Sequence, residues 1–165
     1  MTASTVIRRA TQADWPALWG TIEPVFRAGD TYAVDPNITE DTARALWLDG
    51  PAATFIAEQD DEVPLGTYYI KANFAGGADH ICNCGYITSM QATGKGVATS
   101  MCLHSQDTAR GLGFRAMQFN LVLASNTRAV ALWHRLGYET IGQLPDAFRH
   151  PSLGLVNAHI MWKTL

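Results

Sequence analysis

The segment Gln91-Ala92-Thr93-Gly94-Lys95-Gly96-Val97-Ala98 is the centre of the predicted fold, because it joins an apolar stretch to a helical pattern. Two glycines separated by one residue let the backbone turn tightly and approach a ligand closely. The N–H groups of such a turn, with the positive end of the following helix, can hold a pyrophosphate. Lys95 would add one point charge. The segment therefore predicts a phosphate-binding turn.

Two better-known kinds of glycine-rich phosphate loop do not fit this segment. It lacks the Lys-Ser/Thr pair of a Walker phosphate loop and the three-glycine spacing of a dinucleotide fold. Glycines punctuate loops in many proteins, so Gly94 and Gly96 alone are better explained as the plain end of a strand. The neighbouring sequence has to decide between a ligand-binding turn and a plain one.

The sequence around the turn alternates strand and helix patterns. We expect a strand at 80–90, a helix at 97–111 and a second strand at 115–123, whose apolar run is typical of a buried parallel strand. Asn126 is then expected to cap a helix at 127–136. This order predicts an α/β fold.

The rest of the chain completes the pattern as one domain over residues 1–165. Strands are expected at 5–9, 53–58, 65–74, 138–142 and 155–163, and further helices after Asp14 and from Thr39. An acidic hairpin loop is expected at 59–62 and a longer loop at 143–154.

Composition excludes several classes of protein. Hydrophobic residues make up 47% of the chain and charged residues 16%, which excludes disorder and a coiled coil. The net charge of −3, without a basic run, argues against a nucleic-acid partner. No apolar run approaches the roughly 18 residues of a membrane helix. We expect a soluble, cytoplasmic protein without a membrane partner.

The three cysteines, Cys82, Cys84 and Cys102, lie in apolar surroundings. An odd number in such surroundings is typical of reduced thiols in a cytosolic protein. Because no second Cys/His pair with ligand spacing follows Cys82 and Cys84, we predict no metal site.

Two motifs at suitable separation resemble the GNAT acetyltransferases: Gln91-x-x-Gly94-x-Gly96, and Asn126-x-x-Ala129-x-x-Leu132-Trp133-x-x-x-Gly137-Tyr138. The resemblance implies a mixed, mostly antiparallel sheet of about seven strands with splayed middle strands, flanked by about four helices. It also implies acetyl-CoA as co-substrate. The residues that it assigns to acetyl-CoA are Thr88, Ser89, Met90, Gln91, Thr93, Gly94, Lys95, Gly96, Val97, Ala98, Asn126, Ala129 and Trp133.

The resemblance also implies the chemistry, which is direct attack of a neutral amine on the thioester. A backbone amide near Ser89 or Met90 would bind the oxyanion. Many relatives have a Tyr that protonates the thiolate at the position occupied here by Trp133, and an indole N–H is not an acid at useful pH. The acid is therefore left open, and packing is the favoured role of Trp133.

Asn83 and Asn120 are amides inside otherwise apolar strands, and each is either satisfied by neighbouring backbone or placed for a ligand. With Asn126 and the closing segment 145–150, they resemble acetyltransferases of azetidine-2-carboxylate and related proline analogues. That resemblance implies that Asn83 hydrogen-bonds near the reacting amine or carbonyl and that Asn120 binds the substrate carboxylate, both as catalytic and substrate-binding residues. Phe148 and Arg149 would complete the substrate site, although such an Arg is more often a surface residue.

The function predicted from the sequence is N-acetylation of a small-molecule amine, with detoxification of a toxic amino acid as one purpose. The alternative activity is N-acetylation of proteins or peptides. Because Trp133 replaces the usual Tyr, a non-catalytic acetyl-CoA-binding module is a further alternative. Dimers are common in the family that the chain resembles, so we expect a homodimer.

Overall fold

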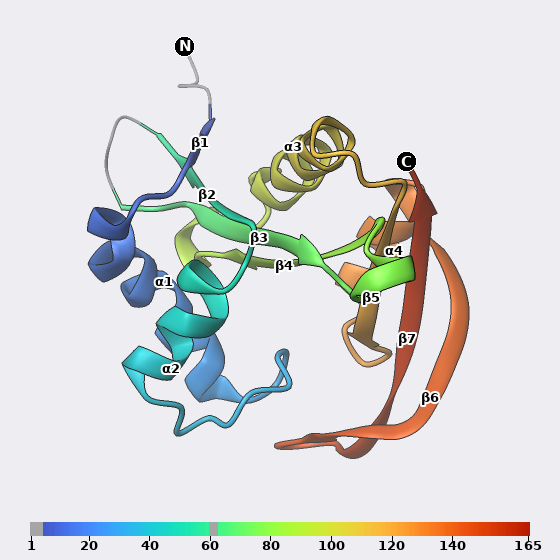
Figure 1. Ribbon diagram of the computed structural model, residues 1–165. Helices are drawn as coiled ribbons and strands as arrows, with labels where there is room; N and C mark the ends of the chain where they lie inside the picture. Colours follow the sequence, from blue (N-terminus) through green and yellow to red (C-terminus); the bar gives the residue numbers. More distant parts are fainter. Residues whose placement is uncertain (1–4, 60–62) are drawn as a thin grey trace.

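The computed structural model describes residues 5–59 and 63–165, which form a seven-stranded sheet with the order β1-β2-β3-β4-β5-β7-β6 (Figure 1). The strands are β1 (Val6–Arg9), β2 (Ala53–Glu58), β3 (Gly66–Ala72), β4 (Ile81–Thr88), β5 (Ala116–Leu123), β6 (Glu139–His150) and β7 (Gly154–Thr164). Only the pair β4 and β5 is parallel among the pairs of this sheet, and the others are antiparallel. The expected mixed, mostly antiparallel sheet is confirmed.

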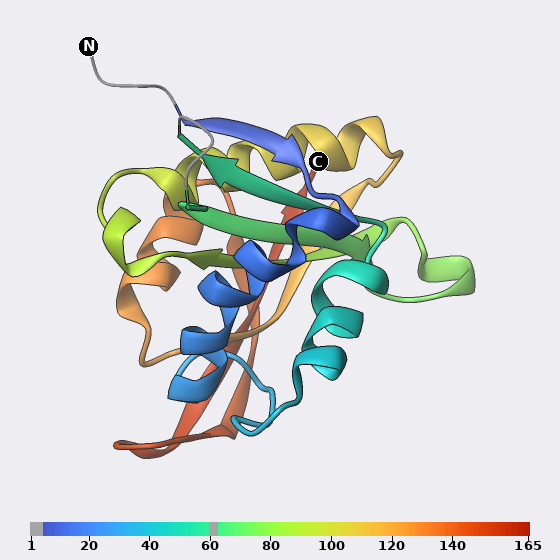
Figure 2. The same ribbon diagram turned by 90° about the vertical axis from the view of Figure 1, so that its left-hand side faces the viewer.

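Four α-helices flank this sheet in the described chain: α1 (Trp15–Ala28), α2 (Glu40–Arg44), α3 (Val97–Gly111) and α4 (Thr127–Arg135). The π-helical turn Ala45–Asp49 continues α2. Helices α1 and α2 cover one face of the sheet and α3 covers the other, as Figures 1 and 2 show. Two separate clusters of buried side chains fill these interfaces, one under α3 and α4 and one under α1 and α2. The sheet is therefore covered on both faces, as its apolar strands require.

Strands β4 and β5 separate soon after they meet. Their pairing is confined to Ile81 with Ala116 and Cys82 with Met117, near the start of both strands. Beyond these pairs the strands diverge, while each keeps its outer neighbour, β3 or β7. We call this divergence the fork. It leaves backbone groups of two central strands facing a gap.

The segment 143–154, expected as a loop, is mostly strand. Strand β6 continues to His150, and its pairing with β7 resumes at Phe148 after a register shift. Asp146 takes a φ of +48° within this shift, and its amide donates to Asn157 Oδ1 (2.9 Å). The two strands form a long hairpin at one side of the molecule (Figure 1). The loop predicted from residue propensities is wrong here, because backbone hydrogen bonds between β6 and β7 hold the segment as strand.

Asp14 precedes α1 as expected, but its side chain makes no capping bond to that helix. It accepts from the Thr11 amide (2.7 Å) and from the Arg8 guanidinium (2.9 and 3.0 Å). The hydrogen bond from Arg8 holds the pKa of Asp14 well below its usual range. Thr39, by contrast, caps α2 by accepting from the Thr42 amide.

Most other expected elements are confirmed within a few residues, including Val97–Gly111 at both ends. The hairpin loop expected at 59–62 lies, apart from Gln59, outside the described residues. Cys82, Cys84 and Cys102 are buried free thiols. No helix in the described ranges is long and apolar enough to cross a membrane.

Candidate active site

The turn between β4 and α3 has the backbone that the glycines predicted. Gly94 and Gly96 both have a φ of +79°, which a side chain would strain. A Cβ atom at either glycine would meet nothing within 4 Å. Helix α3 begins at Val97, and in its first turn the Ser100 amide donates to the Gly96 carbonyl (3.0 Å). The amides before Ser100 therefore have no acceptor within the helix and can bind an anion.

A cavity of about 470 Å³, which we call the turn cavity, opens in front of these amides. Its walls are the turn with the start of α3, residues 88–99, and helix α4 with its cap, residues 126–135. Arg128 and Arg135 line it from α4, seven residues apart and hence on one face of that helix. Backbone amides and two guanidinium groups give the cavity the chemistry of a phosphate site.

The predicted residues divide between two cavities and the outer surface. Thr88, Thr93, Gly94, Gly96, Val97 and Ala98 line the turn cavity. Asn126 and Ala129 line both this cavity and a second one, and Trp133 lines the second. Ser89, Met90, Gln91 and Lys95 are not among the residues that line either of them. Lys95 therefore does not contribute to the lining of the site, and Met90 is 84% exposed.

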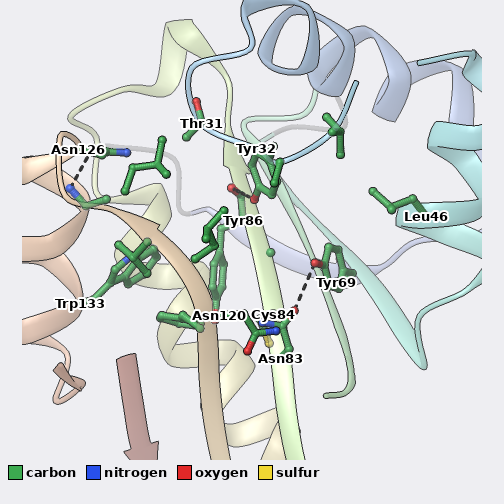
Figure 3. Close-up of a pocket in the computed structure, with 18 of the residues that line it drawn as sticks. Thr31, Tyr32, Leu46, Tyr69, Asn83, Cys84, Tyr86, Asn120, Asn126 and Trp133 are labelled. Atoms are coloured by element: carbon green, nitrogen blue, oxygen red, sulfur yellow. Dashed lines mark hydrogen bonds between the residues drawn. The ribbon is translucent and has the colours of Figure 1, made fainter. Parts of the chain in front are cut away.

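The second cavity, of about 360 Å³, lies at the fork and is called the fork cavity. Its lining comes from both faces of the sheet: Trp133 of α4 on one side, and Tyr32 and Leu46 on the other (Figure 3). A passage between the faces exists because β4 and β5 have separated. The two cavities share Asn126 and Ala129, so they meet at the start of α4.

Asn126 builds that junction. It is the N-cap of α4, and its Oδ1 accepts from the Ala129 amide (3.2 Å), as Figure 3 shows. The predicted cap is confirmed. It orients α4 so that the helix forms a wall of both cavities.

Strand β4 presents its backbone to the fork cavity. Ser89 N donates to Leu65 O and Asn73 N donates to Ile81 O, each at 2.8 Å. Because alternate residues of a strand face alternate neighbours, the backbone groups of Cys84, Tyr86 and Thr88 face away from β3. An extended ligand can bind to such an edge as an added strand does.

Two backbone groups near this end of β4 already have partners in the structure. The Ser89 amide, expected as an oxyanion donor, is used in the ladder with β3. The Tyr86 carbonyl accepts from the Tyr32 hydroxyl at 2.6 Å. Of the two backbone amides expected to bind the oxyanion, the Met90 amide is therefore the remaining candidate. Its role stays a prediction.

Asn83 lies directly after the last pair of β4 and β5, and it is buried (8% exposed). Its Nδ2 donates to the Gln118 carbonyl (2.9 Å) and its Oδ1 accepts from the Tyr69 hydroxyl (3.3 Å). The first bond satisfies a β5 carbonyl that the divergence would otherwise leave unpaired. Asn83 therefore holds the fork in place and also lines the cavity.

Asn120 lies beside Asn83 at the fork cavity (Figure 3). Unlike Asn83, it is exposed to solvent. It exchanges two hydrogen bonds with the Asn73 amide (2.6 and 3.0 Å) and accepts one from Gln118 Nε2 (3.0 Å). The fork thus places both predicted asparagines on one cavity.

Burial keeps the ionisable hydroxyls and thiol of the fork cavity neutral. Burial raises the pKa of Tyr69 to about 12, and it raises the pKa values of Tyr32, Tyr86 and Cys84 well above their usual values. These groups therefore act as hydrogen-bond donors or apolar surface at neutral pH.

Comparison with known proteins decides the family. The model of the family described as Acetyltransferase (GNAT) family matches residues 14–138, which is most of the chain. The chain belongs to the GNAT acetyltransferase family.

Individual relatives agree with this assignment. N-acetyltransferase aca1 of Schizosaccharomyces pombe is 29% identical over 148 residues, 80% of this chain and 71% of that protein. A GCN5-related N-acetyltransferase from Kribbella flavida is 39% identical, with 98% of each chain covered and a TM-score of 0.92. A phosphinothricin acetyltransferase from Sinorhizobium meliloti, solved in complex with acetyl-CoA, shares the fold at 18% identity and a TM-score of 0.85, with 98% of this chain and 88% of that one covered.

In this GNAT acetyltransferase, Trp133 packs among aromatic rings. Its ring centroid lies 5.0 Å from that of Phe119 and 5.2 Å from that of Tyr86. These contacts support the packing role, and Trp133 also lines the fork cavity.

The substrate residues expected in the closing segment do not join this site. Phe148 and Arg149 pair with Val156 and Leu155 in the β6–β7 hairpin, and neither is among the residues that line the two cavities of the GNAT site. The physical reason is the hairpin itself, because its ladder holds the segment as strand instead of folding it over the fork.

Sequence reasoning missed three cationic side chains of the GNAT site: Arg128, Arg135 and Lys71. The two arginines were detectable, because they follow the capping Asn126 at a spacing that places both on one helix face. Lys71 gave no such signal, because it enters the fork cavity through the pairing of β3 with β4.

Proposed function

We propose that this chain uses acetyl-CoA to acetylate the amino group of a small molecule, with the turn cavity holding the phosphates and the fork cavity holding the acceptor. The junction of the two cavities at Asn126 and Ala129 carries the proposal. A ligand bound by its phosphates at the α3 amides has a continuous path from there to the gap between β4 and β5.

The residues present fit acetyl-CoA. The open space in front of Gly94 and Gly96 is what a pyrophosphate in contact with the backbone requires. Arg128 and Arg135 supply positive charge beside it, and the edge of β4 supplies hydrogen-bonding groups for a pantetheine chain. When bound, acetyl-CoA supplies the activated acetyl group that the amine attacks.

The chain's own residues would position the acceptor. Asn83 is fixed by two hydrogen bonds at the fork, so its amide is preorganised beside the gap. The aromatic surface of Trp133 and Phe119 keeps water from the junction. Within this proposal, Asn83 acts near the reacting amine and Asn120 near the acceptor's carboxylate, as in the acetyltransferases of proline analogues.

A small-molecule acceptor is favoured over a protein by the dimensions of the fork cavity. Its volume of about 360 Å³ lies within the usual range for small-molecule sites. Detoxification of a toxic amino acid is the purpose that we propose for the reaction. A location in the cytoplasm and assembly as a homodimer stay predictions.

The test is acetyl-CoA-dependent release of free thiol, measured with a thiol-trapping reagent. The acceptors would be azetidine-2-carboxylate, proline, hydroxyproline, phosphinothricin, polyamines and short peptides. We expect turnover of cyclic amino acids. Turnover of peptides alone would replace the proposal with protein acetylation, and bound acetyl-CoA without turnover of any amine would indicate a binding module.

A further inference from the structure

Lys71 brings an unexpected positive charge to the fork cavity. It lies near the end of β3, directly opposite Asn83 of β4, and its side chain is half-buried. Its Nζ lies 5.3 Å from the centroid of the Tyr69 ring, two residues earlier on the same face. Lys71 is one of the residues that line the cavity.

This charge is not balanced within the cavity. Of the described residues that line it, Lys71 is the one whose side chain carries a formal charge at neutral pH, since the tyrosines and Cys84 are neutral. In the described ranges 5–59 and 63–165, Lys71 takes part in no ion pair. Four arginines, Arg8, Arg27, Arg44 and Arg110, do have carboxylate partners. A partly desolvated cation favours an anionic ligand.

Two amide side chains, Asn83 and Asn120, line the same cavity as Lys71. Asn73 follows Lys71 by two residues, and the amide pair that it forms with Asn120 continues through Gln118 to Asn83. Each amide nitrogen has two hydrogens, and the bonds in this chain use one hydrogen of each nitrogen. Asn83 and Asn120, which line the cavity together with Lys71, therefore each keep one further N–H to donate, and a carboxylate accepts from such groups and from an ammonium group.

We propose that Lys71 binds a carboxylate of the acceptor, so that the substrates of this enzyme are amino acids and not simple amines or polyamines. The inference rests on the proposed function and adds to it the charged group that recognises the acceptor's carboxylate. It gives Lys71 the carboxylate-binding role for which Arg149 was the candidate from the sequence. A carboxylate bound there places the amino group of a small amino acid at the fork.

The same charge also disfavours the wrong acceptors. A polyamine would bring further positive charge toward Lys71 without a carboxylate to offset it, which costs binding energy. A nearby cation also favours the neutral form of the acceptor's amine, and the neutral form is the one that reacts. Lys71 thus selects for an anion and against unneutralised cations.

The test compares pairs of acceptors that differ only in the anion: proline with prolinamide, and azetidine-2-carboxylate with its amide. Four enzymes are compared by kcat and KM: the unchanged chain, Lys71→Met, Lys71→Arg, and Arg115→Met as the control. Arg115 is exposed and lines neither of the two cavities, so its replacement removes the same charge elsewhere.

We expect Lys71→Met to raise KM for the carboxylate acceptors about tenfold to a hundredfold, the usual loss for a hydrogen bond to a charged group. KM for the amides should change less than about threefold, Lys71→Arg should keep much of the preference, and Arg115→Met should behave as the unchanged chain. Thermal unfolding of each variant checks that it is folded. Should Lys71→Met misfold, Lys71→Gln would be measured in its place.

The outcomes separate the two proposals. Equal rates on the carboxylates and their amides in the unchanged chain, or equal losses on both in Lys71→Met, would overturn the role of Lys71 and leave acetylation of amines intact. A chain that acetylates no amine on the wider panel would overturn the proposed function, and this inference with it.

Discussion

The two cavities of this acetyltransferase meet at one helix start but are built from different groups. The turn cavity is lined by the glycine turn, the start of α3 and one face of α4. The fork cavity is lined mostly by side chains, which come from the loop after α1, from the turn that continues α2, from three strands and from α4. Binding through backbone groups tolerates changes of side chain but not of φ. Binding through side chains has the opposite sensitivity.

The sharpest test of this contrast is Gly96→Ala. A Cβ at a φ of +79° strains the backbone, and it would stand in open space at the turn that we propose to hold the phosphates. We expect KM for acetyl-CoA to rise about a hundredfold, equivalent to roughly 3 kcal/mol of binding. Steady-state kinetics with the acceptor held saturating measure it.

Gly113→Ala is the matched control for Gly96. Gly113 also has a positive φ (+87°) and open space at its Cβ, but it lies beyond the other end of α3, outside the turn cavity. Both variants should lose about 1–2 kcal/mol of folding stability. If both changed KM for acetyl-CoA alike, binding by the turn would be refuted.

The second test concerns the charges of the turn cavity. Replacing both Arg128 and Arg135 by Ala should raise KM for acetyl-CoA about tenfold, because two exposed guanidinium groups each contribute modestly. The loss should shrink at high salt, which already screens such exposed charges. Kinetics at low and high ionic strength measure both effects.

Lys95→Ala supplies the contrast for the arginines. Lys95 lies in the glycine turn but is not among the residues that line the turn cavity, so its loss should change KM by less than about twofold. A larger effect of Lys95 than of the arginine pair would mean that the turn closes over the ligand in another conformation.

The third test removes one hydrogen bond at the fork cavity and has a smaller expected effect than the first two. Tyr69→Phe removes the hydroxyl that donates to Asn83 (3.3 Å), and kcat/KM for the acceptor should fall about threefold, as for one neutral hydrogen bond. Since burial raises the pKa of Tyr69 to about 12, the hydroxyl stays protonated below that pH. The shape of the rate profile between pH 7 and pH 10 should therefore not change.

The measurement is kcat/KM for the acceptor as a function of pH, for the unchanged chain and for Tyr69→Phe. KM for acetyl-CoA serves as the internal control, because Tyr69 lines the fork cavity and not the turn cavity. Loss of an alkaline limb on removal of the hydroxyl would show instead that Tyr69 gives or takes a proton in the reaction.

Much of the fold could be predicted from the sequence, and the reason is local. Glycines at a required positive φ, the capping Asn126 and the helical period of 97–111 each act within a few residues. Local sequence gave a wrong prediction at 143–154: turn-forming residues there indicated a loop, but hydrogen bonds between β6 and β7 hold most of the segment as a hairpin.

Neighbouring residues alone were enough to predict the family, the phosphate-binding turn and the helix that faces it, because they encode backbone geometry. Which side chains meet at the acceptor depends instead on how the strands pair. Lys71 faces Asn83 because β3 pairs with β4 in that register, and Asn120 reaches Asn73 across the fork. The closing segment stays away because its hydrogen bonds are made within the hairpin. Contacts between strands depend on register and divergence, which are properties of the whole sheet.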